Sequence, residues 1–134
     1  MRVVLDTNVL VAAFTTEGVC ATLLRRARKR EFQLVLCPII FQEFRGVLRK
    51  KFAATTDEVR DAVTLIHEAV EEVVPDPAAI SRISRDRSDD AVLACALAAS
   101  AEVLVTGDDD LLSLRAFHGI QIIQPRDFEA LFAD

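Results

Sequence analysis

The sequence predicts an α/β fold in three layers, in which helices cover both faces of a central, mostly parallel sheet of about five strands. Short apolar runs of strand length alternate along the chain with longer segments of helical character, which is typical of βαβ units. Several acidic residues follow directly after these runs, where parallel sheets collect functional groups. The 134 residues are most economically one domain, residues 1–134, since a chain of this length buries about two thirds of its unfolded surface.

Five apolar runs predict the strands of the sheet. They are Val3–Leu5, Leu34–Leu36, Val70–Val74, Val103–Val105 and Ile120–Ile123. After the first run, Gly18 predicts a break between a short helix and a second helix that ends in the basic sequence RRARKR.

The later helices carry recognisable start signals. Pro38 and Pro125 suit the first position of a helix, and Thr55 with Glu58 forms a capping-box pattern. Ser88 precedes a helix predicted over Asp89–Ala101, which is apolar nearly all round and is therefore expected to be buried. The stretch from Pro75 to Ser88 predicts the longest irregular connection.

The composition, 51% hydrophobic and 28% charged, is that of a globular protein. No apolar run approaches the roughly 20 residues of a membrane span, and Asp6 and Asn8 interrupt the apolar N-terminus where a signal peptide would be continuous. We therefore expect a cytoplasmic protein without a membrane partner. Cys20, Cys37 and Cys95 are widely spaced among apolar neighbours and are expected to be small buried side chains, not disulfide or zinc ligands.

The first two candidate functional acids are Asp6 and Glu43. Asp6 follows the first predicted strand; it could be a helix N-cap, but a cap alone does not explain the polar Thr7 and Asn8 that follow it. A helical wheel places Glu43 at the edge of an apolar face, near Ile40, and a surface role remains an alternative.

Two further acidic groups follow later in the chain. Asp89 and Asp90 would open a helix, where the helix dipole alone favours acids. The run from Asp108 to Asp110 follows the fourth predicted strand and could be a turn with a capped helix. Acids from separate segments that meet at one sheet edge would repel by several kcal/mol per close pair. We therefore expect a compensating hard cation, Mg²⁺ or Mn²⁺.

These motifs resemble the PIN-domain ribonucleases, and within them the VapC-type toxins of bacterial and archaeal toxin–antitoxin pairs. The resemblance spans nearly the whole chain, through VVLDTNVLVAAF, CPIIFQEFRGVLRK, RDRSDDAVLACALAASAEVLVTGDDDLLSL and GIQIIQPRDFEALF in that order. It implies a PIN-like fold and a metal-dependent endoribonuclease that cuts RNA.

The resemblance also implies roles for individual residues. The four catalytic and metal-binding acids would be Asp6, Glu43, Asp90 and Asp108, with Asp90 matched in preference to Asp89. Asn8, Thr106 and Asp110 would be supporting residues. Cys37, Ser100 and Asp109 depart from the family's usual residues, and Asp109 adds a negative charge where a basic residue is frequent.

Recognition of RNA requires cations, although the net charge of −5 argues against non-specific coating of nucleic acid. One candidate surface is the first basic run, with Arg25, Arg26, Arg28 and Lys29. A second run carries Arg45, Arg49, Lys50 and Lys51. The helical wheel turns Arg45 and Arg49 away from Glu43, and these two could instead serve a dimer or an antitoxin. Either run could also be a solvated helix end.

The expected partners, by resemblance, are an RNA substrate, a small antitoxin protein and a second copy of the chain in a homodimer. The alternatives are a housekeeping RNA-processing nuclease and a catalytically weak PIN domain that only binds proteins. A phosphoacceptor receiver domain would need an acidic pair after the first strand and a lysine after the last, and neither is present. A haloacid-dehalogenase-type phosphatase would need Asp-x-Asp where this chain has Asp6, Thr7 and Asn8.

Overall fold

The computed structural model describes residues 1–77 and 87–132 of the chain. Its centre is a sheet of six strands in the order β3-β2-β1-β4-β6-β5. The strands are β1 (Arg2–Leu5), β2 (Gln33–Leu36), β3 (Val70–Val73), β4 (Val103–Val105), β5 (Ala116–Phe117) and β6 (Ile120–Ile123). All neighbouring strands are parallel except β5 and β6. The predicted mostly parallel sheet is thus confirmed.

Strand β5 is the element that the sequence did not predict. It has two residues and turns back onto β6 through His118 and Gly119, whose φ angles are 51° and 81°. Positive φ at both central residues is the requirement of a tight hairpin whose twist matches its strands. Two residues are too few to show an alternating pattern, so this edge strand escaped detection.

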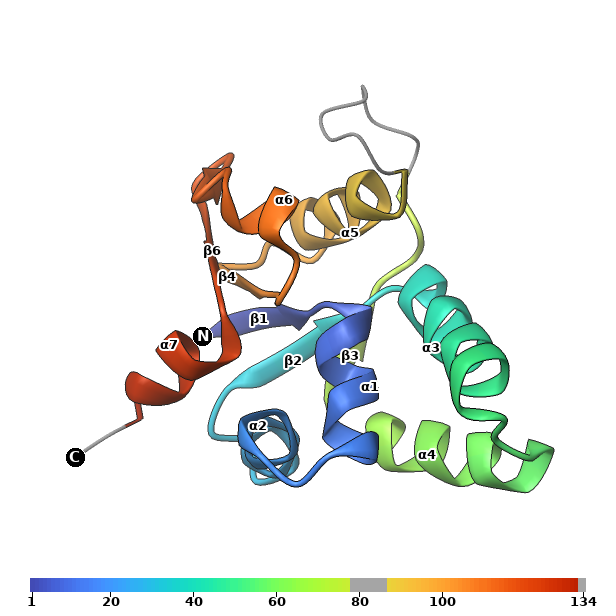
Figure 1. Ribbon diagram of the computed structural model, residues 1–134. Coiled ribbons are helices and arrows are strands. Elements are labelled where there is room, and N and C mark those ends of the chain that lie inside the picture. The colour runs from blue at the N-terminus through green and yellow to red at the C-terminus, as the bar shows by residue number, and fades with distance from the viewer. Residues whose placement is uncertain (78–86, 133–134) are drawn as a thin grey trace.

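Seven helices connect and cover the strands within the part of the chain that the structure describes. They are α1 (Thr7–Thr15), α2 (Val19–Arg28), α3 (Pro38–Phe52), α4 (Thr56–Ala69), α5 (Arg87–Ala98), α6 (Asp109–Leu112) and α7 (Pro125–Ala130). In Figure 1, α5 and α6 lie above β1, and α1, α2 and α4 lie below it. Helix α3 stands at the side towards which β1 points, beyond the carboxyl ends of β1 and β2.

The central strands are buried on both faces, as a covered parallel sheet requires. Val3, Val4, Leu34 and Leu104 have no exposed surface. Helix α5 is largely buried too, as its all-round apolar character predicted. Its predicted limits are wrong, since the helix begins at Arg87, ahead of Ser88, and ends at Ala98.

A left-handed turn explains the early end of α5. Ser100 has a φ of 52°, and Ala101 N–H donates to Ala96 O at 3.0 Å, which closes the last turn of the helix. The irregular connection predicted after Pro75 lies mostly outside the described residues. All three cysteines are free; Cys37 and Cys95 are buried, and partial burial raises the pKa of the Cys20 thiol.

The start of α4 has the predicted capping box. Thr55 Oγ1 accepts from Glu58 N–H at 3.1 Å, and the Glu58 carboxylate accepts from Thr55 N–H at 2.9 Å. The interactions of the Glu58 carboxylate with the Thr55 backbone N–H and with the Thr55 hydroxyl hold the pKa of Glu58 below its ordinary value. No single helix among the described residues is long and apolar enough to cross a membrane; α1 and α2 qualify only together, bent by 102°.

The start of α3 is capped by a residue remote in sequence. Cys37 makes no side-chain cap, but Asp76, just beyond the end of β3, accepts from Ile39 N–H through Oδ1 at 2.9 Å. Because β3 pairs with β2, the acid that follows β3 lies beside the helix that follows β2. This contact fixes the end of α3 that faces the carboxyl edge of the sheet.

We expect Asp76→Ala to lower the free energy of unfolding by about 1 kcal/mol, because the amide of Ile39 loses its acceptor. Asp76→Asn keeps an oxygen at that position and should retain most of the stability. Urea unfolding followed by circular dichroism measures both variants. Equal midpoints for Asp76→Ala and the wild type would contradict the capping role.

Candidate active site

Asp6 and Thr106 face each other at the carboxyl edge of the sheet. They directly follow β1 and β4, which are neighbours paired through Leu5 and Val105. Thr106 has no exposed surface and donates its hydroxyl to Asp6 Oδ2 at 2.7 Å. The other carboxylate oxygen of Asp6, Oδ1, accepts from Thr7 N–H at 2.7 Å and so caps α1. Asp6 is therefore both a helix cap and a carboxylate held at the edge of the sheet.

Thr106 also connects Asp6 to the turn that contains Asp108. The backbone N–H of Asp108 donates to Thr106 Oγ1 at 3.0 Å. Asp108 uses one carboxylate oxygen, Oδ1, to cap α6, accepting from Asp110 N–H at 2.8 Å and Leu111 N–H at 3.2 Å. Its second oxygen, Oδ2, makes no hydrogen bond within the described part of the chain, so it can serve as a ligand.

Three carboxylates converge beside this turn. Oxygen atoms of Asp89, Asp108 and Asp110 lie within 4.8 Å of one another, with Asp89 buried and the other two half-buried. We call these three residues the carboxylate cluster. At an effective dielectric constant of about 20, each such pair would repel by roughly 3 kcal/mol. A hard divalent cation would offset this repulsion, and Mg²⁺ and Mn²⁺ take carboxylate oxygens as ligands. The donor set therefore fits such a cation.

The carboxylate cluster contains Asp89, whereas the resemblance of the sequence motifs to PIN-domain ribonucleases favoured Asp90. Asp89 lies one helical turn from Leu93 and two turns from Ala96, which are both fully buried, and only 6% of Asp89 is exposed. Asp90 is half-buried and lies outside the group of three. The spacing to Leu93 and Ala96 is the sequence signal that could have identified Asp89. The role predicted for Asp90 stays a prediction.

The remaining predicted site residues are Glu43, Asp110 and Asn8. Glu43 is half-buried on α3 and is not a member of the group of three, whereas Asp110 is. Asn8 is exposed in the first turn of α1. The structure thus joins Asp6, Thr106 and Asp108 by hydrogen bonds and places Glu43 on the helix that begins at the same edge.

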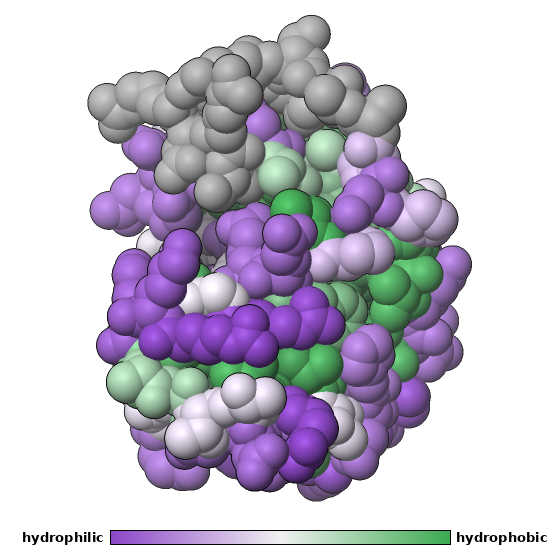
Figure 2. Space-filling model, turned by 90° about the vertical axis from the view of Figure 1, so that its right-hand side faces the viewer, coloured by the Kyte–Doolittle hydropathy of each residue, from purple (hydrophilic) through white to green (hydrophobic). Residues whose placement is uncertain are grey.

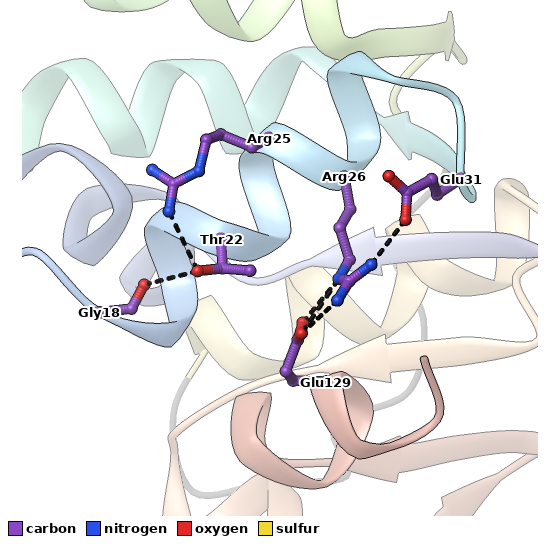
Figure 3. A network of polar contacts seen from close by, with 6 residues as sticks. All are labelled: Gly18, Thr22, Arg25, Arg26, Glu31 and Glu129. Carbon is purple, nitrogen blue, oxygen red and sulfur yellow. Dashed lines mark hydrogen bonds and ion pairs between the residues drawn. The ribbon is translucent and has the colours of Figure 1, made fainter. Parts of the chain in front are cut away.

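The first basic run contributes to the fold. Arg26 binds Glu129 of α7 through two nitrogens, with Nε–Oε2 at 2.8 Å, and Glu31 through Nη1 at 2.6 Å (Figure 3). Its guanidinium also lies 4.7 Å from the centre of the Phe132 ring. These hydrogen bonds to Glu129 and Glu31 raise the pKa of Arg26 above its already high value. Arg26 therefore joins α2 to the C-terminal part of the chain.

The position of the first basic run separates it from the cluster. Arg25 donates to Thr22, within its own helix (Figure 3), and Arg28 pairs with Glu68 at 3.4 Å. Lys29 follows the end of α2, close in sequence to Gln33, where β2 begins. This is the amino end of a parallel strand, and Asp6 and Thr106 stand at the opposite end of the sheet. The predicted RNA-binding role of these cations has no support from their position.

The second basic run borders a hollow along α3. The hollow has a volume of about 660 Å³ and is lined by Ile39, Gln42, Glu43, Arg45, Gly46, Val47, Arg49, Lys50 and Lys51. Figure 2 shows this side of the molecule, where strongly hydrophilic side chains lie across apolar surface. Although the helical wheel separates Glu43 from Arg45 and Arg49, the three residues border the same hollow.

The fold and part of the sequence match known proteins. A model of the PIN domain family matches residues 2–110. A solved structure, described as VapBC2 from Rickettsia felis bound to a DNA fragment from its promoter, has a chain of similar fold, with a TM-score of 0.65. The two chains are 15% identical, and the match covers 92% of this chain and 98% of the other. No curated protein matches the sequence.

We expect Glu129→Gln to lower the free energy of unfolding at pH 7 by about 1 kcal/mol, because Arg26 loses its charged partner. Arg26 holds the pKa of Glu129 below its ordinary value, so the pair stabilises the fold above the unfolded pKa of about 4.3. The difference between variant and wild type should disappear as the pH falls through the lower pKa of the folded state.

Unfolding in urea at several pH values measures this difference. Glu68→Gln is the matched control, because its pair with Arg28 is exposed on both sides and should contribute little. A loss in Glu129→Gln that stays constant down to pH 3 would contradict the ion-pair explanation.

Proposed function

The chain belongs to the PIN domain family, and on this basis we propose that it is a divalent-metal-dependent endoribonuclease, the toxin of a toxin–antitoxin pair. The observation that carries the proposal is the carboxylate cluster at the carboxyl edge of the sheet. Ligand sites of open parallel sheets lie at this edge. Phosphodiester hydrolysis is the chemistry that such an arrangement of acids supports.

The carboxylates would hold one or two Mg²⁺ or Mn²⁺ ions. Asp89, Asp108 through its Oδ2, and Asp110 supply oxygen ligands on one side, and Asp6 supplies a carboxylate on the other side of Thr106. When bound, such an ion lowers the pKa of a water molecule and neutralises the charge that develops on the phosphate and the leaving oxygen.

The protein's own contribution is to fix these oxygens before the substrate arrives. Thr106 donates to Asp6 Oδ2 and accepts from Asp108 N–H, so one buried hydroxyl holds the Asp6 carboxylate and the backbone of Asp108 together after two neighbouring strands. The cap that Asp108 makes to α6 leaves its second oxygen directed away from that helix's amides. Glu43, on α3, would position the attacking water or complete the ligand set.

The toxin role extends the proposal from chemistry to biology. The similar Rickettsia structure is described as a VapBC2 assembly bound to promoter DNA, and we propose a comparable antitoxin partner for this chain. A homodimer and a cytoplasmic location complete this proposal. A domain kept only for protein binding would not need to retain acids at all four predicted positions, Asp6, Glu43, Asp90 and Asp108.

We expect the protein to cleave single-stranded RNA in the presence of Mn²⁺ or Mg²⁺. Cleavage should fall at least about 100-fold in Asp6→Asn and Asp108→Asn, because each substitution replaces a charged ligand with a neutral side chain of the same size. Gel analysis of labelled RNA measures cleavage, and calorimetry measures Mn²⁺ binding. Asp89→Asn and Asp90→Asn together identify which acid of α5 is a metal ligand. The variant that replaces the ligand should lose both RNA cleavage and Mn²⁺ binding, and the other variant should keep both. Wild-type protein that cuts no RNA with either metal would refute the proposal.

Expression of the wild-type chain should arrest bacterial growth, and expression of Asp6→Asn should not. Co-expression of the small protein encoded next to it should relieve the arrest. Colony counts after induction measure the effect. Normal growth of cells with active nuclease would favour a housekeeping RNA-processing enzyme.

A further inference from the structure

The outer side of α3 carries positive charge that the fold does not use. Arg45 is half-buried, and Arg49, Lys50 and Lys51 are exposed. Within residues 1–77 and 87–132 none of these four cations forms an ion pair, whereas Arg26, Arg28 and Arg30 of the first basic run each pair with a glutamate. In a chain with a net charge of −5, this is a local positive surface.

This charge borders the hollow along α3, which is also lined by Glu43, one of the predicted site residues. The same hollow is lined by Glu43 near the start of α3 and by Lys50 seven residues further on, about 10 Å along the helix. Helix α3 begins directly after β2, at the carboxyl edge of the sheet, where its first turn is held by Asp76. The hollow therefore runs from the edge of the sheet outward along a row of cations.

Gly46 forms part of this hollow without a packing reason. A Cβ atom added at Gly46 would meet no other atom of the described residues within 4 Å, so none of the described elements requires a glycine there. A glycine in the interior of a helix is less favourable than alanine. The missing side chain leaves space between Glu43 and Lys50, which is consistent with a ligand that lies across the helix.

We propose that the hollow along α3 is a track for the phosphate backbone of single-stranded RNA, with Arg45, Arg49 and Lys50 as phosphate ligands. This inference rests on the proposed nuclease function and adds the path by which the strand reaches the carboxylates. Single-strand binding combines a cationic groove with aromatic surfaces for the bases, and Phe52, 50% exposed, directly follows Lys51.

A second copy of the chain fits this surface less well than RNA does. In a two-fold interface the same patch meets itself, so the cations of Arg45, Arg49, Lys50 and Lys51 would face their own copies. Like charges placed opposite each other oppose association. An extended polyanion is the occupant that matches both the charge and the open shape of the hollow.

The test removes three of these charges in Arg45→Gln/Arg49→Gln/Lys50→Gln and measures binding of a fluorescein-labelled, mixed-sequence 12-nucleotide RNA. Anisotropy with EDTA present keeps binding separate from cleavage. Each phosphate contact to a single strand contributes about 0.7 to the slope of log affinity against log salt. We expect the slope to fall by about 2 and the affinity at 0.1 M salt to fall on the order of 100-fold.

A competing variant, Arg25→Gln/Arg28→Gln/Lys29→Gln, removes the same charge from the opposite end of the sheet. The track predicts a much smaller loss of RNA affinity in this variant than in the α3 variant. Equal losses of RNA affinity in the two variants would overturn the proposal. Unchanged RNA binding by the α3 variant would also overturn it, and would favour a protein with an acidic segment as the occupant of the hollow.

Gly46→Gln tests the space itself without removing a charge. Because glutamine favours helix over glycine, the melting temperature should stay equal or rise, while RNA affinity falls at least fivefold. Gly46→Ala adds only one carbon and serves as the control. Melting curves show that any loss of binding is not a loss of folding. Unchanged RNA affinity in Gly46→Gln would overturn the proposal.

The two proposals can fail separately. RNA binding that depends on the α3 cations, without cleavage in Mg²⁺ or Mn²⁺, would refute the nuclease function and support the track. Cleavage at the wild-type rate by an α3 variant with unchanged RNA affinity would refute the track and support the nuclease function.

Discussion

The pairing of β1 with β4 is the constraint on which the site depends. It places Asp6 and Thr106 side by side, and the Thr106 hydroxyl then binds Asp6 while accepting from the amide of Asp108. Thr106 has no exposed surface and Asp6 only 8%, so an unmade hydrogen bond between them would cost more than it would in water. Any change in the alignment of these two strands would therefore separate the acids.

The elements with strong periodic signals could be predicted from the sequence. Five strands, the break at Gly18 and the capping box of α4 are local features, and each formed as its own residues dictate. The cap that Asp76 makes to α3 could not be predicted, because its partner lies 37 residues away and is brought near by the pairing of β2 with β3.

The candidate site shows the same division between local and long-range information. That acids gather at the carboxyl edge follows from the alternation of strands and helices. The choice between Asp89 and Asp90 depends on how α5 is rotated against the sheet, which buries Asp89 and leaves Asp90 partly exposed. The ion pair that Arg26 forms depends on α7, which follows about a hundred residues later and supplies Glu129.

The two basic runs show why charge in a sequence does not by itself identify a binding surface. Both contain several cations at the end of a helix, where the dipole favours them. The first run lies near glutamates of α4 and α7, which neutralise much of its charge at the amino end of the sheet. The second run lies in the later part of α3, the helix that begins at the carboxyl edge, and its cations form no ion pair within the described residues. Tertiary placement therefore decides which of the charges written in a sequence are neutralised within the fold and which remain available on its surface.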